Sequence, residues 1–431
     1  MTNIAVVGGG FTGLACATSL IQNDVKVHLY EKQSYLGGLA AGFKDPLWNS
    51  SLEHYYHHWF KSDHYVTEYA NIWGCSDGIK FHRPTTVMET QSNGFVQLDS
   101  ALSLLRYPEL KFSERLRMGL SLAWIKSMSD WRKLDDITAY DWCNKVMGEN
   151  GFNAIWKPLL LGKFGEKFAP EVNMAWLWAR LACRTPQLGT FEGGFSNYIL
   201  RAATWLNAKG AEIETGVREI KLELRKSADS SQPNKWIIND REYDKVVFAL
   251  GPKPFLAIAG DYAPQYTRHL KEKKSLGVQV VILSLKQQIG KPYWYSLIKT
   301  KTQPFLALIE HTNFVSSKEY NNENIIYLAN YVDVQSEDWN WSDEVLRQKA
   351  LHCVQKINSK ISLADLNRSW VFRENYAQPI SGTGAYHSIL PIQIEEAPGL
   401  FHASMSHVYP WDRGTHFALQ LGKNTAELCL S

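Results

Sequence analysis

The sequence predicts an α/β fold in which a domain with a parallel β-sheet is interrupted by an inserted α+β domain that includes a helical cap. Three observations predict it. A glycine-rich turn at the start of the chain follows an apolar strand pattern and precedes a helical one. Helical periodicity with many tryptophans fills residues 62–184, and β-rich alternating segments fill residues 261–370. Strand patterns return between these two segments and again near residue 400.

The glycine-rich turn is the strongest motif. Ile4–Val7 predicts a buried strand, and the glycines that follow fit the G-x-G-x-x-G pattern of a Rossmann-type dinucleotide-binding unit. Gly8 would make the tight turn, Gly10 would let a pyrophosphate approach the backbone, and Gly13 would let the helix pack against the strand. The N-terminus of that helix would offer N–H groups and a positive dipole end to the phosphates.

A second strand pattern supports the same interpretation. Val25–Tyr30 alternates and leads into Glu31, eighteen residues beyond Gly13. A carboxylate at that distance accepts hydrogen bonds from an adenosine ribose. Leu36–Leu39, Leu-Gly-Gly-Leu, then brings more backbone toward the same ligand. The alternative is a glycine-rich surface turn followed by a solvated glutamate.

Composition excludes several classes of protein. The chain has 431 residues and a formal charge of +3, which does not suggest a nucleic-acid partner. We find no leader pattern, no run of eighteen apolar residues and no metal-ligand spacing. The six cysteines are scattered and fit reduced core thiols. We therefore expect a cytoplasmic protein without a metal.

The remaining elements follow in chain order. We expect helices over Tyr65–Trp73, Ser113–Ser129, Thr138–Met147, Val172–Ala182, Ser196–Ala208 and Ser342–Ile357, and a last helix that begins near Gly414–His416. We expect strands over Ala211–Val217, Trp236–Ile238, Glu242–Leu250, Val278–Leu285, Pro304–His311, Ile325–Val332 and Leu400–Met405. The tryptophans of the first helices are core residues in one interpretation and a lipid-facing surface in another.

The segment Glu53–Phe60, Glu-His-Tyr-Tyr-His-His-Trp-Phe, has two interpretations. It is either a half-buried strand with hydrogen-bonded histidines or the wall of an active site. In the second case His57 or His58 lies near the reacting atoms and moves a proton, as an imidazole with a pKa near ~6.5 can.

The chain resembles the flavin-containing amine oxidase superfamily, in particular its protoporphyrinogen oxidase-like and phytoene desaturase-like bacterial branch. The motifs that carry the resemblance are the glycine turn, Glu31, the Gly37-Gly38 pair, His57–Asp63, Lys163–Gly165, Ala175–Trp178, Glu192–Phe195, Glu310–Asn313, Tyr376–Pro379 and Tyr409–Arg413. The superfamily has Arg-x-Gly-Gly-Arg around the glycine pair, whereas this chain has Tyr35 and Leu39 at the arginine positions.

The resemblance implies FAD as cofactor and a Rossmann-type, glutathione reductase-like FAD domain. We assign residues 1–60, 190–260 and 371–431 to that domain and residues 61–189 and 261–370 to a substrate domain. The expected FAD-binding residues are Gly8, Gly10, Phe11, Thr12, Gly13, Glu31, Lys32, Gly37, Gly38, Leu39, Val217, Asp412, His416 and Phe417. The expected catalytic residues are His57, His58 and Tyr409, and Glu310–Thr312 is a candidate substrate contact.

The implied reaction is hydride transfer from a bulky, hydrophobic small molecule to flavin N5. The first alternative is a redox-neutral sugar-nucleotide mutase, because His57–Phe60 also resembles the His-x-Phe-His segment of UDP-galactopyranose mutase. That reaction needs basic residues for a diphosphate, and Arg180, Arg184 and Arg373 are candidates. The second is a flavin-binding scaffold without activity. Peripheral contact with the inner face of a membrane and the oligomeric state both stay open.

Overall fold

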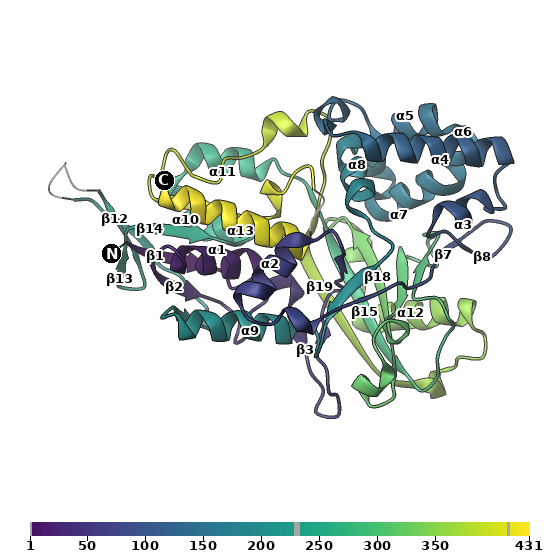
Figure 1. Cartoon of the computed structure of the whole chain (residues 1–431), viewed down its shortest axis with the longest axis horizontal. Coiled ribbons are helices and arrows are strands. Elements are labelled where there is room, and N and C mark those ends of the chain that lie inside the picture. The colour runs from purple at the N-terminus through teal and green to yellow at the C-terminus, as the bar shows by residue number, and fades with distance from the viewer. Residues whose placement is uncertain (1, 228–232, 412–413) are drawn as a thin grey trace.

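The computed structural model describes residues 2–227, 233–411 and 414–431. Figure 1 shows two halves side by side, one built on a parallel sheet and the other made of a helical cap above a large, mostly antiparallel sheet. No helix in the described ranges is long and apolar enough to cross a membrane.

A five-stranded sheet forms the first half. Its order is β10-β2-β1-β14-β20, and every neighbouring pair is parallel. The strands are β1 (Asn3–Val7), β2 (Lys26–Tyr30), β10 (Glu212–Glu214), β14 (Lys245–Phe248) and β20 (Leu400–His402). The central strands are buried on both faces, which explains why they appear in the sequence as continuous apolar runs rather than alternating ones.

Different layers cover the two faces of the parallel sheet. On one face the helices α1 (Phe11–Ile21), α2 (His64–Ile72), α9 (Phe195–Ala208) and α13 (Thr415–Leu430) share one core. The other face packs against β11 (Leu222–Arg225), β12 (Lys235–Ile238), β13 (Arg241–Tyr243), α10 (Pro252–Ala259) and α11 (Pro264–Lys271). The predicted α/β fold class is therefore confirmed.

The second half contains a seven-stranded sheet of order β19-β15-β18-β17-β16-β7-β8. The strands are β7 (Thr86–Glu89), β8 (Phe95–Gln97), β15 (Ser275–Leu285), β16 (Trp294–Ser296), β17 (Ala307–Glu310), β18 (Asn324–Val332) and β19 (Leu366–Pro379). α12 (Asp343–Ile357) covers one face. Because β7 pairs with β16, segments from before residue 190 and after residue 260 meet in one sheet.

The helical cap has its own core, rich in tryptophan and phenylalanine. Its helices are α3 (Ala101–Leu105), α4 (Phe112–Ser127), α5 (Ala139–Trp142), α6 (Glu149–Gly151), α7 (Lys157–Phe168) and α8 (Met174–Cys183). The single helix predicted over 138–147 is only partly right. Residues 143–147 continue as a π-helical turn, and Gly148 ends it with a φ of +89°.

Small sheets lie where the two halves join. β3 (Gly42–Phe43) pairs with β4 (Leu52–Glu53), while β5 (Trp59–Phe60) and β6 (Ile79–His82) flank β9 (Leu188–Phe191).

The division into two domains stays a prediction, but three observations bear on where the boundaries lie. α2 packs in the core of the parallel-sheet half, although it follows the proposed boundary at residue 60. β19 runs across the proposed boundary at residue 370 and stays in the seven-stranded sheet as far as Pro379. β9 contains the boundary at residue 190.

Candidate active site

Two glycines of the first turn are required by the packing of the protein itself. Gly8 follows β1 with a φ of +111°, and a Cβ there would lie 2.5 Å from the Ala249 carbonyl oxygen. A Cβ on Gly13 would lie 1.9 Å from the Gly8 carbonyl oxygen. Both positions therefore hold α1 close to the sheet, as the sequence predicts.

Gly10 is different, because open space rather than crowding surrounds its α-carbon. A Cβ on Gly10 would meet no atom closer than 3.7 Å, and that atom is the α-carbon of Gly38. Gly37 and Gly38 have φ values of +117° and +57°, and the Gly37 N–H donates to the Gly9 carbonyl at 2.8 Å. The facing backbones of Gly10, Gly37 and Gly38 form what we call the glycine cradle.

The N-terminus of α1 opens on this cradle. Gly10 is its N-cap, and no side chain caps the first turn. Uncapped N–H groups beside bare glycine backbone fit a pyrophosphate, which needs close approach and hydrogen-bond donors. The cradle therefore fits the phosphates of FAD.

Glu31 is held in a fixed orientation beside the cradle. Its carboxylate accepts hydrogen bonds from the Gly9 N–H at 2.8 Å and from the Gln33 N–H at 2.8 Å. A carboxylate has about four lone-pair sites, so two further acceptor positions fit ribose hydroxyls. The Val217 N–H donates to the Glu31 carbonyl at 2.9 Å. The Val217 N–H is thus occupied, which leaves the Val217 carbonyl as the backbone group that fits an adenine.

The other predicted residues of this region have different environments. The ring of Phe11 is buried and stacks on Tyr198 at 5.8 Å between centroids, so it is a core side chain. The carbonyl of Thr12 lies against α13, where a Cβ on Gly422 would come within 2.3 Å of it. Lys32 is exposed and Leu39 is half-buried. For Phe11 and Thr12 the backbone is the part that fits cofactor contact, and the roles of Lys32 and Leu39 stay predictions.

The C-terminal segment returns to the carboxyl edge of the parallel sheet. Gly414 precedes α13, and the Thr415 hydroxyl accepts a hydrogen bond from the Trp59 indole N–H at 2.7 Å. This bond joins the histidine-rich segment to the start of the last helix. The predicted Asp412 lies outside the described residues.

The side chains of His416 and Phe417 have different surroundings. Burial, and then the neighbouring His64, lower the pKa of His416 to about 4, so its imidazole is neutral near pH 7. Its Nδ1 is buried without a partner among the described residues. The ring of Phe417 stacks on Trp411 at 5.1 Å, and Trp411 lies 5.4 Å from Trp178 of the cap. Phe417 therefore packs toward the cap.

His57 and His58 lie in an irregular stretch between β4 and β5, so the expected continuous strand is wrong here. The Nδ1 of His57 lies 2.5 Å from the Tyr55 carbonyl, and its ring lies 6.0 Å from the Phe195 ring. Burial is the largest cause that lowers the pKa of His58 to about 3, followed by Arg184. His58 is therefore neutral near pH 7 and carries no proton to donate as an imidazolium.

Arg180 and Arg184 form an electropositive region beside His58. Both side chains are exposed to solvent. Loss of hydration, and then Arg180, nevertheless lower the pKa of Arg184 to about 10. Arg373, the third basic candidate, is an ion-pair partner of Asp343 at 2.6 Å and lies toward α12.

The hydroxyl of Tyr409 is held within the protein. It hydrogen-bonds to the buried Asp135 and accepts from the Asn173 amide at 2.8 Å. Both partners belong to the cap, and Asn173 also donates to the Gly382 carbonyl at 2.7 Å. Tyr409 therefore joins the C-terminal segment to the cap, and its predicted role as a catalytic group gains no support from this geometry.

The candidate substrate contact at 310–312 is not supported. Glu310 is buried and accepts hydrogen bonds from the Ile289 and Gly290 N–H groups at 2.8 and 3.0 Å. The buried His311 lies 2.8 Å from the Tyr320 hydroxyl. Glu310 therefore holds the loop before β16, and His311 holds the turn that contains Tyr320. A motif at the end of a strand does not reveal either role.

Sequence reasoning assigned no role to two polar groups near the site. Ser404 and Ser406 follow β20 at the carboxyl edge of the parallel sheet, and the Ser406 hydroxyl lies 2.9 Å from the Tyr376 hydroxyl. Lys163 is buried, with its ammonium 4.8 Å from the ring of Trp176 and 5.6 Å from that of Tyr331. For Ser404 and Ser406, the signal in the sequence was their position just after the last strand. For Lys163, it was a lysine within an apolar helical pattern.

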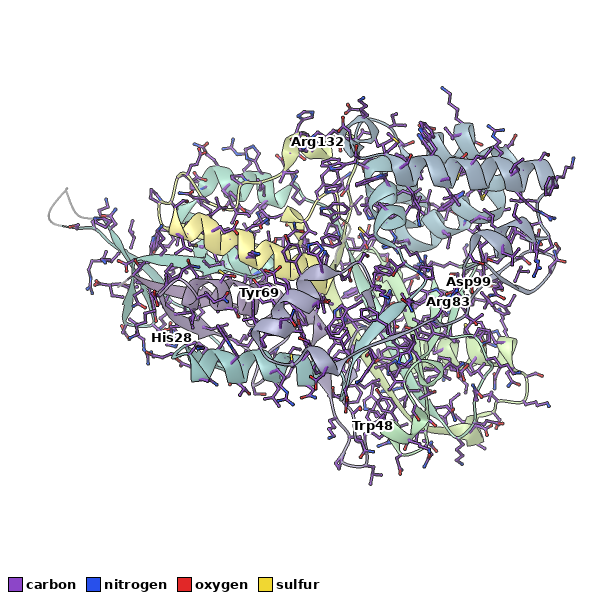
Figure 2. The ribbon with its side chains drawn as sticks, in the orientation of Figure 1. His28, Trp48, Tyr69, Arg83, Asp99 and Arg132 are labelled. Carbon is purple, nitrogen blue, oxygen red and sulfur yellow. The ribbon has the colours of Figure 1, made fainter. Side chains whose placement is uncertain are left out.

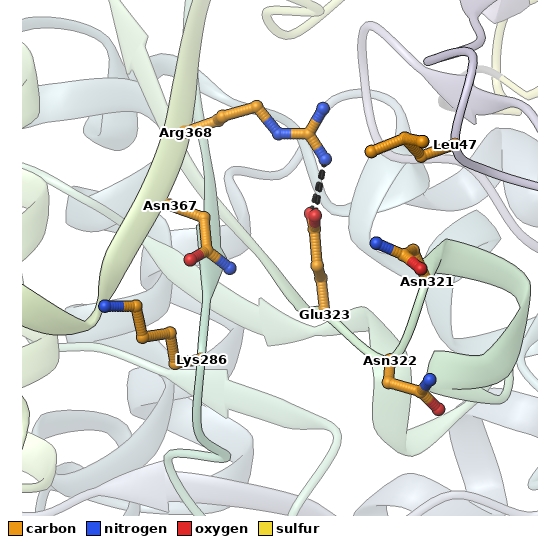
Figure 3. Close-up of a pocket in the computed structure, with 7 residues that line it drawn as sticks. All are labelled: Leu47, Lys286, Asn321, Asn322, Glu323, Asn367 and Arg368. Atoms are coloured by element: carbon orange, nitrogen blue, oxygen red, sulfur yellow. Dashed lines mark hydrogen bonds and ion pairs between the residues drawn. The ribbon is translucent and has the colours of Figure 1, made fainter.

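A surface groove of about 570 Å³ lies elsewhere, on the seven-stranded sheet (Figure 3). Its lining residues are Leu47, Lys286, Asn321, Asn322, Glu323, Asn367 and Arg368. Arg368 and Glu323 pair with each other at 2.6 Å. No predicted site residue lines the groove, and we do not assign the site to it.

A parallel sheet with a glycine cradle at the start of α1 and a carboxylate placed for a ribose has the character of a dinucleotide-binding site. The model of the family described as flavin containing amine oxidoreductase matches residues 11–430. The chain belongs to this family. This confirms the predicted class, a flavin-dependent oxidoreductase, and the predicted cofactor, FAD.

The individual proteins that resemble the chain share only part of its sequence. Hydroxysqualene dehydroxylase of Sinorhizobium fredii is 30% identical over 277 residues, which are 60% of this chain and 61% of that protein. Zeta-carotene desaturase of Synechocystis is 21% identical over 272 residues, 57% of this chain and 55% of that protein. The chain thus matches less than two thirds of the length of either relative.

A solved structure agrees in fold over the whole chain. A protoporphyrinogen oxidase-like protein from Exiguobacterium sp. 255-15 superposes with a TM-score of 0.75 at 16% identity, covering 99% of this chain and 98% of that one. At this identity the similarity concerns the fold. It agrees with the predicted fold, and the match to the family model confirms the resemblance that the sequence motifs predict.

Proposed function

We propose that the chain oxidises a long, mostly apolar isoprenoid substrate by removal of hydride. The observation that carries the proposal is that the two relatives have names referring to hydroxysqualene and zeta-carotene, which are both isoprenoid chains. Trp178 of the cap and Trp411 of the C-terminal segment lie against each other, and Trp411 stacks on Phe417 at the start of α13. Such walls fit an apolar substrate, with few polar groups to orient it.

Bound FAD supplies the hydride acceptor in this proposal. The glycine cradle, the start of α1 and Glu31 would hold its ADP part. The chain's own contribution to the reaction is position and exclusion of water, since hydride transfer needs little else. His58, neutral near pH 7, can accept a hydrogen bond at Nδ1, which has no partner among the described residues.

The redox-neutral mutase remains the second candidate, because Arg180 and Arg184 lie beside His58 and a diphosphate needs basic residues. Arg373 no longer supports it, since that side chain pairs with Asp343. Cytoplasmic location stays a prediction.

The experiment follows flavin absorbance without oxygen. Squalene-type and carotene-type polyenes in detergent should bleach the oxidised flavin, and His58→Ala at full FAD occupancy should slow the bleaching at least about tenfold. Phe60→Leu, a change in a neighbouring half-buried ring, serves as the packing control. Turnover of a UDP-sugar only after dithionite reduction, with no bleaching by any polyene, would favour the mutase instead.

A further inference from the structure

The helix α4 carries an apolar stripe on its solvent side. Phe112, Leu116, Leu120 and Trp124 are 68%, 46%, 64% and 52% exposed. Residues four apart in a helix lie on one face, so the four side chains form a continuous stripe about 18 Å long. Figure 1 shows α4 on the outer side of the cap.

The opposite side of α4 is also apolar. Met118 and Ile125 are buried in the core of the cap. A helix on a protein surface normally keeps one polar face toward water, and one that is apolar on both sides is normally covered on both. The neighbouring α3 adds Leu102 and Leu105, which are 56% and 39% exposed. The outer face of α3 and α4 therefore has the character of a covered surface.

Basic residues border this face. Residues 101–127 contain five arginines and lysines and two glutamates. The carboxylates of Glu109 and Glu114 accept hydrogen bonds from Asn93 at 2.6 Å and Asn150 at 2.7 Å. On a helix with 100° per residue, Lys126 lies on one side of the stripe and Arg117 on the other. The stripe is thus apolar along its length and positive at its borders.

A small cavity of about 180 Å³ lies beside α3. Val96, Gln97, Ser100, Leu102, Ser103 and Arg106 line it. Arg106 is exposed, and its guanidinium makes no hydrogen bond or ion pair within the part of the chain that the structure describes. Figure 2 labels Asp99 and Arg132, which flank the segment in sequence. An exposed arginine in the lining of a small cavity, next to exposed leucines, fits a phosphate group above acyl chains.

We propose that the outer face of α3 and α4 docks on the surface of a membrane that contains anionic phospholipids. Helices that lie in the membrane interface have phenylalanine, leucine and tryptophan on one face, and lysine and arginine border that face. A second copy of the chain fits less well, because a two-fold contact would place the basic borders of both copies opposite each other. The contact does not depend on the proposed reaction.

The test is co-sedimentation of the FAD-loaded chain with vesicles. Wild type should pellet with phosphatidylcholine vesicles that contain phosphatidylglycerol and much less with phosphatidylcholine alone. Leu116→Gln combined with Leu120→Gln should weaken binding at least about tenfold, because the variant lacks two leucine side chains that would move from water into the membrane. Leu200→Gln on α9 is the matched control, since Leu200 is 61% exposed on the other half of the molecule, and should bind as wild type does.

A second pair of variants tests the charge. Arg106→Gln combined with Lys126→Gln should weaken binding to the anionic vesicles roughly tenfold. All variants should keep wild-type flavin content, since none of the substituted side chains is buried.

Three results would overturn the proposal. One is wild type that stays in the supernatant with both kinds of vesicle. Another is a Leu116→Gln/Leu120→Gln variant that pellets as well as wild type. The third is a dimer in analytical ultracentrifugation that the leucine variant abolishes while vesicles bind nothing, because a second copy would then cover the stripe. Equal binding to neutral vesicles would remove the anionic lipid from the proposal.

Discussion

The parallel-sheet half and the helical cap differ in how closely their backbones pack. In α1, a Cβ on Gly13 would lie 1.9 Å from a backbone oxygen, whereas in α4 the nearest atom to a Cβ on Gly119 is a leucine methyl at 4.0 Å. Backbone against backbone cannot yield, but side chains can repack. Main-chain contacts therefore fix α1 in the parallel-sheet half, whereas at Gly119 in the cap only a side chain comes near α4.

The largest effect should come from Gly13→Ala. A methyl group at 1.9 Å from the Gly8 carbonyl forces α1 away from the sheet, so we expect a loss of about 4 kcal/mol or more in the free energy of unfolding. Urea unfolding followed by circular dichroism measures it. A loss below about 1 kcal/mol would mean that the main chain of this half can adjust, and the contrast with the cap would fail.

A second effect concerns a feature that both halves share, a buried carboxyl group. Burial raises the pKa of Glu53 from 4.5 to about 7, although its carboxylate accepts from the Phe195 N–H at 2.8 Å. The folded state therefore keeps a proton that the unfolded chain has lost, and stability falls as pH rises from about 4.5 to about 7. The loss amounts to about 3 kcal/mol above that window.

Glu53→Gln should remove this fall, because the amide oxygen still accepts from Phe195 and carries no charge. We expect the variant to gain up to about 3 kcal/mol over wild type at pH 8 and little at pH 4.5. The matching variant in the other half is Glu310→Gln, since burial also raises the pKa of Glu310 to about 7. Thermal unfolding of the variants and wild type between pH 4.5 and pH 8 measures the gain in stability. An equal gain at pH 4.5 and at pH 8 would contradict a raised pKa of the buried glutamate.

A third and smaller effect separates ligand contact from packing. Gly10→Val should keep the fold, because the φ of Gly10 is −75° and its neighbourhood is open, but should weaken FAD binding at least tenfold, about 1.4 kcal/mol. Gly10→Ala is the control for backbone entropy. Titration of the apoprotein with FAD measures both. Unchanged affinity in the valine variant would remove Gly10 from the phosphate site.

The smallest effect belongs to the cap. Gly119→Ala in α4 should stabilise the protein by up to about 1 kcal/mol, since alanine is the better helix former and its methyl group has room. The same substitution thus has opposite signs in the two halves. Destabilisation by Gly119→Ala, in the same urea assay, would show that the cap is as tightly packed as α1.

The sequence predicted the parts of the molecule whose signal is local. The strand before Gly8, the helix after it, the position of Glu31 and the start of α13 all follow from residues that are near one another in the chain. Main-chain geometry demands glycine at these turns, and that demand is visible in the sequence.

Long-range contacts have no such signal. Nothing near residues 86–89 indicates that β7 pairs with β16, which begins at residue 294. In the same way Tyr409 looks available until Asp135 and Asn173 meet it from the cap. Glu310 looks like a binding group until its partners at residues 289 and 290 are placed. The predicted site residues whose side chains are bonded within the protein are those with partners distant in sequence.

The packing of α13 on α1 has a consequence for the order in which the protein is made. α1 ends at Ile21 and α13 begins at Thr415, roughly 390 residues later. A ribosome that adds about 5–20 residues per second needs on the order of half a minute or more to cover that distance. Until then the surface of α1 that receives Gly422 is bare, and β20 has not yet joined β14. The parallel-sheet half is therefore completed only when the end of the chain has been made.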